Sequence, residues 1–301
     1  DNKSVPLPPK LFSHNDQQAY WQSSFQTEGA ATGWGGRAAD LIMSNNNRSS
    51  LTCVSINGNA LFLSGQSAIS YQMSATGATT VNAIKGKSLF SSAACATALQ
   101  TLMTQSSATP MGSEYNVVAK RALDTYDGIV AAIGANPSAS LNALFPSAAS
   151  NTLSAQLKMV ARLIEQQAAF GMKRQVFMVG MGGFDLHDFL PLQHPALLQK
   201  LSAAMKEFDD AMVSLGKDKQ VTTFTASDFG RTLASNGDGS DHGWGGHHFV
   251  MGGAVAGGQF FGIAPEIGLT HNEQVGSGRL LPSTSVDQLG AELAGWFGVS
   301  P

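Results

Sequence analysis

The chain has 301 residues, enough to bury the core of one large α/β domain, which we expect to span 1–301. Its net charge of -3 and the lack of any run of lysine or arginine argue against nucleic acid or an anionic membrane as a partner. Only 13% of the residues are charged, yet no apolar stretch reaches the length of about 18 residues that a transmembrane helix needs.

The first third of the chain predicts two helices and one buried strand. Prolines make residues 1–12 an extended lead-in, and Ser13 is a suitable N-cap for the helix that follows. A glycine-rich turn separates the two helices, and a polar segment after the strand is typical of a loop or a small β excursion. We expect helices over 14–26 and 37–44, the strand over 51–56 and the loop over 57–80.

The two cysteines lie in different predicted elements, Cys53 in the strand and Cys95 in an Ala- and Ser-rich helical run. They can form a disulfide only if the fold brings their Cα atoms within about 7 Å. Two separate small core residues are the simpler interpretation.

A largely helical insertion is expected over about 88–172, with breaks at prolines. Its clearest helix covers 151–169, where apolar residues recur at steps of three and four and so share one buried face. These residues are Leu153, Leu157, Val160, Ile164 and Ala168. The pattern indicates core packing rather than a cofactor site.

Residues 176–226 have the pattern of a strand, a helix and a second strand. The strands are expected over 176–179 and 221–226, with the helix over about 197–215. Such βαβ crossovers are parallel and right-handed, so Asp185 and Asp228 should lie at the carboxyl edge of neighbouring strands.

The final segment predicts a short strand at 249–251 and a helix over 286–297 that Ser283 or Thr284 caps. Taken together, the elements predict an α/β fold with a mostly parallel central sheet and helices on both faces.

Carboxylates and imidazoles gather in the loops that follow the predicted strands. Such oxygen and nitrogen ligands suit one or two divalent ions such as Zn, Mn, Mg or Ca. The expected ligands are Asp185, His187, Asp228, Asp241, His242 and His247. On a strand His247 and His248 cannot point the same way, and His247 is preferred slightly. The alternative is structural: Asp228 caps a turn through Arg231, and the histidines satisfy loop carbonyls.

Two further residues are candidates for catalysis. Arg231 is able to clamp an anionic substrate through its guanidinium fork, and a structural salt bridge is an equal alternative. Ser13 is the candidate nucleophile, because its hydroxyl would lie at the positive end of a helix dipole with His14 and Asp16 beside it. An ordinary N-cap is the alternative role of Ser13.

Several motifs together resemble the DUF1501 family and occur in the same order over nearly the whole chain. They are Phe12-Ser13-His14-Asn15-Asp16-Gln17-Gln18 with Trp21, Thr32-Gly33-Trp34-Gly35-Gly36-Arg37, Gly182-Gly183-Phe184-Asp185-Leu186-His187, Ser227-Asp228-Phe229-Gly230-Arg231-Thr232, and Asp241-His242-Gly243 with Gly252-Gly253. The resemblance implies a sulfatase-like branch of the alkaline-phosphatase superfamily and the three-layer sandwich of that superfamily. It also implies twin-arginine export to the periplasm or beyond, an earlier strand before Asp1 that carries another metal ligand, and a short tail after Pro301.

By the same likeness, Asp185 with His187, Asp228, and Asp241 with His242 fall where the superfamily places metal ligands. The chain departs from the phosphatases in two places. Phe229 follows Asp228 where they have a histidine, and no histidine stands four residues after Asp185.

These features predict an exported, metal-dependent hydrolase of phosphate or sulfate esters that acts on a small or polymeric anionic substrate. The alternative is a non-catalytic cell-envelope or surface protein that keeps the fold as a binding or assembly module. An open site where the ligands meet favours the hydrolase. Both expectations require Asp185 and Asp228 at the same edge of the sheet.

Overall fold

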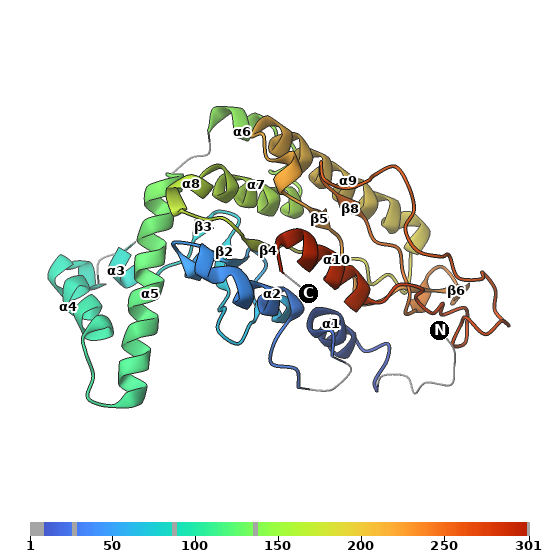
Figure 1. The fold of residues 1–301 in the computed structure, drawn as a ribbon, viewed down its shortest axis with the longest axis horizontal. Coiled ribbons are helices and arrows are strands. Elements are labelled where there is room, and N and C mark those ends of the chain that lie inside the picture. Colours follow the sequence, from blue (N-terminus) through green and yellow to red (C-terminus); the bar gives the residue numbers. More distant parts are fainter. Residues whose placement is uncertain (1–8, 26–28, 86–88, 135–137, 300–301) are drawn as a thin grey trace.

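In a computed structural model, the structure describes residues 9–25, 29–85, 89–134 and 138–299. The fold is mixed α/β, with a small four-stranded sheet among helices (Figure 1). In the order β3-β2-β1-β4, the strands β2, β1 and β4 are parallel and β3 is an antiparallel edge. Their bounds are β1 Cys53–Ser55, β2 Tyr71–Ser74, β3 Gly77–Ala78 and β4 Val176–Met178. The predicted mostly parallel sheet is confirmed, although it is small, and the three-layer sandwich stays a prediction.

Strand β1 is the centre of this sheet. All of its residues are buried, as the apolar run 51–56 predicts, and Val54 pairs with Tyr71 on one side and Phe177 on the other. Since side chains alternate along a strand, Val54 joins one hydrophobic cluster and Cys53 joins another. The segment 57–80, predicted as a loop or a small β excursion, supplies both β2 and β3.

The larger hydrophobic cluster lies between the sheet and two long helices, α7 (Thr152–Glu165) and α9 (Leu190–Ser214). The predicted apolar face of α7 is buried at Leu153, Leu157, Val160 and Ile164. Helix α9 begins earlier than position 197 and continues through Pro195. Asn151 caps α7 by accepting from the amide of Leu153, which fixes where α7 begins.

The predicted parallel pairing of 221–226 beside β4 is wrong. Strand β5 (Thr223–Phe224) pairs antiparallel with β8 (Val250–Met251) in a separate two-stranded sheet. The reason is that main-chain groups of 223–225 bond to 249–251. Phe224 nonetheless packs against the same hydrophobic cluster as Val176 and Met178 of β4. Strands β4 and β5 therefore still border the same part of the core.

The C-terminal helix α10 (Val286–Phe297) begins where the sequence predicts. Its cap is Ser285, with a capping box to Gln288, and not Ser283 or Thr284. The remaining elements are α1 His14–Ser23, α2 Trp34–Ile42, α3 Asn82–Lys85, α4 Ala93–Thr104, α5 Pro110–Ile133, α6 Ala139–Ala143, α8 Gln167–Phe170, β6 Arg231–Ser235 and β7 Ser240–His242. Helix α4 and the N-terminal part of α5 form a hairpin that extends away from the rest of the molecule, whereas Ile129 near the other end of α5 is part of the larger hydrophobic cluster (Figure 1).

Further expectations from the sequence concern the N-terminal segment, the cysteines and membrane-spanning helices. The lead-in over 1–12 lies mostly outside the described residues, as does Gln26, the expected end of the first helix. Both cysteines are free, and burial raises the pKa of the Cys53 thiol to about 12. Across the described ranges no helix is long and apolar enough to cross a membrane.

Candidate metal centre

Segments that are far apart in sequence meet beyond the carboxyl ends of β4 and β5. His14, the first residue of α1, stands between the two predicted carboxylates. Its Nδ1 atom lies 2.7 Å from Oδ2 of Asp228, and its Nε2 atom lies 3.1 Å from Oδ2 of Asp185. Asp185 and Asp228 are therefore at the same edge of the fold, which both functional expectations require.

His242, at the end of β7, approaches the same carboxylate from another side. Its Nε2 atom lies 2.8 Å from Oδ1 of Asp185, and its Nδ1 atom lies 2.9 Å from the carbonyl oxygen of Phe12. A carbonyl only accepts, so Nδ1 of His242 carries the hydrogen and Nε2 of the neutral ring carries the lone pair.

His187 completes the set from the loop after β4. Its Nε2 atom lies 3.0 Å from Oδ1 of Asp185 and 3.2 Å from Nε2 of His242. Its Nδ1 atom faces Oδ1 of Asp241 at 3.4 Å. The residues at i and i+2, Asp185 and His187, thus do point at one place, because they lie in a loop rather than along a strand.

The three imidazoles share one arrangement. Each turns Nδ1 toward an oxygen acceptor and Nε2 toward the Asp185 carboxylate, so lone pairs face one another unless a proton or a cation lies between them. Acceptors behind the ring are the usual surroundings of metal-binding histidines. Two ligands about 2.0–2.1 Å from a tetrahedral zinc ion lie about 3.3 Å apart, close to the 2.8–3.2 Å between these donors. The residues therefore fit a divalent ion.

Three of these residues lie close enough together to share one ion. Within the part of the chain that the structure describes, one ligand atom each from His14, Asp185 and His242 lies within 4.8 Å of the others. The side chains of Asp185 and His187 are each 45% exposed, whereas that of His242 is 10% exposed. The centre is thus open to solvent on one side and closed behind His242.

Electrostatics within the cluster favour its charged forms. Burial tends to raise the pKa of the Asp185 carboxyl, but hydrogen bonds from the protonated forms of the His242 and His14 rings outweigh it and lower that pKa. The hydrogen bond to Asp228 is the largest influence on His14 and raises its pKa against the effect of burial. The cluster consequently attracts either protons or a metal cation to the space around Asp185.

Arg231 and Phe229 form the wall next to His242. The Phe229 ring stacks on His242 at 4.2 Å, and the Arg231 guanidinium lies 4.8 Å from the centre of the Phe229 ring. Arg231 donates to the carbonyls of Phe184 and Ser240 and lies 3.8 Å from Oδ1 of Asp185. Burial lowers its pKa from a very high ordinary value. Arg231 therefore fastens the β6–β7 hairpin to the loop that carries Asp185.

The other predicted site residues do not face the space around Asp185. Asp228 and Asp241 contact imidazole Nδ1 atoms rather than the shared space at Asp185. His247 is exposed and is not among the described donors that meet at Asp185. Ser13 stands at the N-cap position of α1, yet its side chain makes no capping hydrogen bond.

Two contributions from α1 are not predicted by the sequence patterns. His14, which the sequence places only as a neighbour of Ser13, contacts both carboxylates. Gln17 and Gln18 donate to the backbone oxygen and to Oδ2 of Asp228, respectively. The available signal was the dense polar run over 12–18 at the start of a helix.

Comparison with known proteins gives one result. The model of a family described as "Protein of unknown function (DUF1501)" matches residues 1–297. No curated protein and no solved structure matches the chain.

Proposed function

The chain belongs to the DUF1501 family, and we propose that it is an exported metal-dependent hydrolase of phosphate or sulfate esters. We also propose that it is a sulfatase-like relative of the alkaline phosphatases, with their three-layer architecture and twin-arginine export. The motifs over 12–18, 182–187, 227–232 and 241–243 support this proposal, because they are the segments that meet at the candidate metal centre.

The observation that carries the proposal is the convergence of three Nε2 atoms on one carboxylate. His14, His242 and Asp185 would hold the ion, with His187 beside Asp185, and oxygen acceptors behind the imidazoles would orient them. A set rich in nitrogen favours Zn over Mn, Mg or Ca, which suit oxygen ligands. When bound, such an ion polarises an ester oxygen and lowers the pKa of a nucleophilic hydroxyl.

Nearby residues would take the remaining roles in substrate binding and nucleophilic attack. The exposed side of Asp185 and His187 admits a substrate, and Arg231 places a cation beside it. Ser13 is the candidate nucleophile because it precedes His14 directly and its hydroxyl is not used to cap α1. His14, whose Nδ1 contacts Asp228, supplies an imidazole where Phe229 replaces the histidine of the phosphatases.

The first test is elemental analysis by mass spectrometry of protein purified without chelator. We expect near-stoichiometric metal in the wild type and its loss in a variant that combines Asp185→Asn with His242→Ala. His271→Ala is the matched control, because that ring contacts Gly268 and Glu273 in a separate loop. A wild type without metal under every loading condition overturns the proposal.

The second test measures hydrolysis of p-nitrophenyl phosphate and p-nitrophenyl sulfate by the loaded protein. Ser13→Ala should retain the metal and lose turnover by about 100-fold or more if Ser13 is the nucleophile. Bound metal without turnover of any ester would instead support the binding or assembly role.

A further inference from the structure

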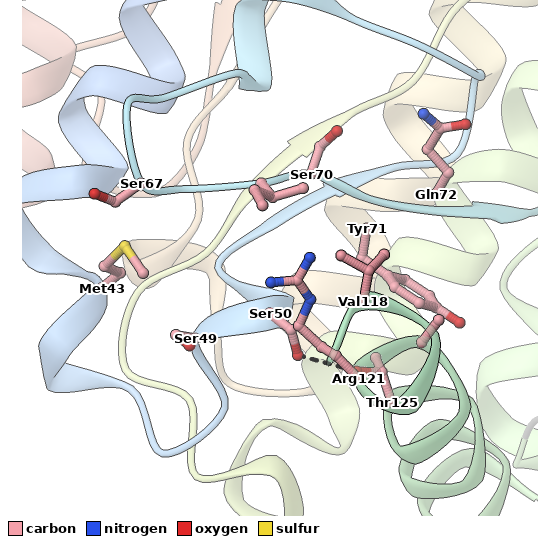
Figure 2. A pocket seen from close by; sticks show the side chains of 12 residues that line it. Met43, Ser49, Ser50, Ser67, Ser70, Tyr71, Gln72, Val118, Arg121 and Thr125 are labelled. Carbon is pink, nitrogen blue, oxygen red and sulfur yellow. Dashed lines mark hydrogen bonds between the residues drawn. The ribbon is translucent and has the colours of Figure 1, made fainter. Parts of the chain in front are cut away.

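We propose that the protein has a second binding site, at the opposite edge of the sheet, for a small ligand with an oxyanion head and a short apolar body. The site is a cavity of about 270 Å³ between helix α5 and the segment that leads into β2 (Figure 2). It is independent of the proposed hydrolase activity.

The position of the cavity follows from the direction of the strands. Ser49 and Ser50 precede β1, and Ile69 and Ser70 precede β2. Because β1, β2 and β4 are parallel, these residues lie at the amino edge of the sheet. The metal cluster follows β4 and β5, at the carboxyl edge. The two sites therefore lie at opposite ends of the strands.

The positive charge of Arg121 favours an anionic ligand in this cavity. Arg121 of α5 is the one charged residue among those that line it, and it has no hydrogen-bond or ion-pair partner within the described ranges. Its neighbour Lys120, by contrast, pairs with Asp124 at 2.6 Å. The nearby carboxylate of Asp40 contacts the amide of Ser67, but it already accepts two further amides. An unpaired guanidinium fork is suited to a carboxylate, sulfonate, sulfate or phosphate.

Hydroxyl groups surround the guanidinium. Figure 2 shows the Arg121 side chain extending from α5 among the serines that line the cavity. Four serines and Thr125 contribute hydroxyls, and Ser50 bonds to Thr125 at 3.1 Å. A hydroxyl can turn its hydrogen toward an oxyanion at little cost, so these groups add donors to the arginine fork.

Apolar side chains provide the rest of the lining. Ile69 is 59% exposed and Val118 is 42% exposed, and Met43 and Ala122 line the same cavity. A ligand with an apolar body would cover this surface, which a bare inorganic anion would leave in water. A cavity of about 150 Å³ is enough for a benzene ring, so 270 Å³ accommodates a ring with its head group.

The test uses benzenesulfonate, which has the required head and body and contains no ester to hydrolyse. Its binding to the full chain is measured by ligand-observed NMR, beside methyl phenyl sulfone as a neutral analogue and inorganic sulfate as the head alone. We expect benzenesulfonate to bind at least tenfold more tightly than either. Benzenesulfonate that binds no better than the neutral sulfone overturns the proposal, because the head is then not recognised.

Four variants locate the site. Arg121→Gln should weaken benzenesulfonate binding about tenfold or more, whereas Lys120→Gln, which removes the same charge from the adjacent residue, should not. Ala122→Trp, at an exposed position of α5, should block the cavity while Arg121 is intact. Binding that survives both cavity variants, or is lost in Asp185→Asn, places the ligand elsewhere and overturns the proposal.

Discussion

His242 is held on three sides by other residues. Phe12 accepts from its Nδ1 atom, the Phe229 ring covers its face, and Arg279 donates Nε to its backbone oxygen at 2.9 Å. Arg279 also lies 4.7 Å from the centre of the Phe12 ring. Phe12 has a φ of +74°, which costs roughly 1–2 kcal/mol for a bulky residue. The contacts of Arg279 offset that strain and keep the Phe12 carbonyl aimed at His242.

Arg279 should therefore act as a positioning residue for the metal. We expect Arg279→Gln to weaken cobalt binding about tenfold and to change the visible absorption spectrum of the cobalt-loaded protein, because His242 loses its orientation. Arg279→Lys should restore much of the affinity through the retained cation over Phe12. An unchanged spectrum and affinity in Arg279→Gln would show that Phe12 and Phe229 suffice.

Two substitutions decide whether Asp228 is a ligand or an orienting partner. His14→Ala removes a donor that faces Asp185, so we expect metal binding to fall by far more than 100-fold. Asp228→Asn leaves His14 in place and only alters the acceptor behind it, so a loss of about 10–100-fold is expected. Calorimetric titration with zinc measures both. Equal losses would assign Asp228 to the ion directly, as the sequence alone suggests.

At the scale of elements, local patterns were the predictable part of the structure. The buried face of α7 follows from its apolar spacing, and the bounds of α10 follow from the local sequence, although its cap is Ser285. The partner of β5 did not follow, because its main-chain groups are taken by residues 249–251, and the periodicity of a strand does not encode its partner. The role of His14 was equally hidden, since it depends on a contact with a residue 214 positions away.

One turn joins α2 to the segment before β2. Both carboxylate oxygens of Asp40 accept backbone amides, from Gln66 on one side and from Ser67 and Ala68 on the other. Burial tends to raise the pKa of Asp40, but these hydrogen bonds lower it overall. Gly65 leaves room for the carboxylate, because a Cβ there would lie 2.5 Å from Oδ1.

Asp40→Asn should consequently lower the free energy of unfolding by about 1–2 kcal/mol in urea titrations at neutral pH. Because the folded pKa is the lower one, this stabilisation is present above the unfolded pKa of about 3.9. It is lost as the pH falls through the folded pKa, so wild type and variant should converge in acid. Asp124→Asn, at an exposed ion pair, is the control and should change little. A neutral-pH difference as small as that of the control would contradict the argument.

At the scale of the whole molecule, the candidate metal centre links parts of the chain that are far apart in sequence. His14 begins α1, Asp185 and His187 follow β4, and His242 ends β7. Helix α1 is also held by Gln17 and Gln18, which donate to Asp228, and by Trp21, which packs near Trp34 and Phe224. An ion at Asp185 would thus couple the N-terminal helix to the β6–β7 hairpin.

Removal of that ion should loosen the same segments first. With free metal about 1000-fold above its dissociation constant, the bound ion stabilises the fold by about 4 kcal/mol, which corresponds to a rise in Tm on the order of 5–10 °C. We expect a chelator to abolish this rise and to increase amide hydrogen exchange over 12–18 and 240–243 while the core helix α7 stays protected. The His242→Ala variant should show neither response, because it has no site to empty. A chelator that lowers Tm equally in both proteins, or that accelerates exchange in α7 as much as in α1, would mean that the ion does not join these segments through Asp185.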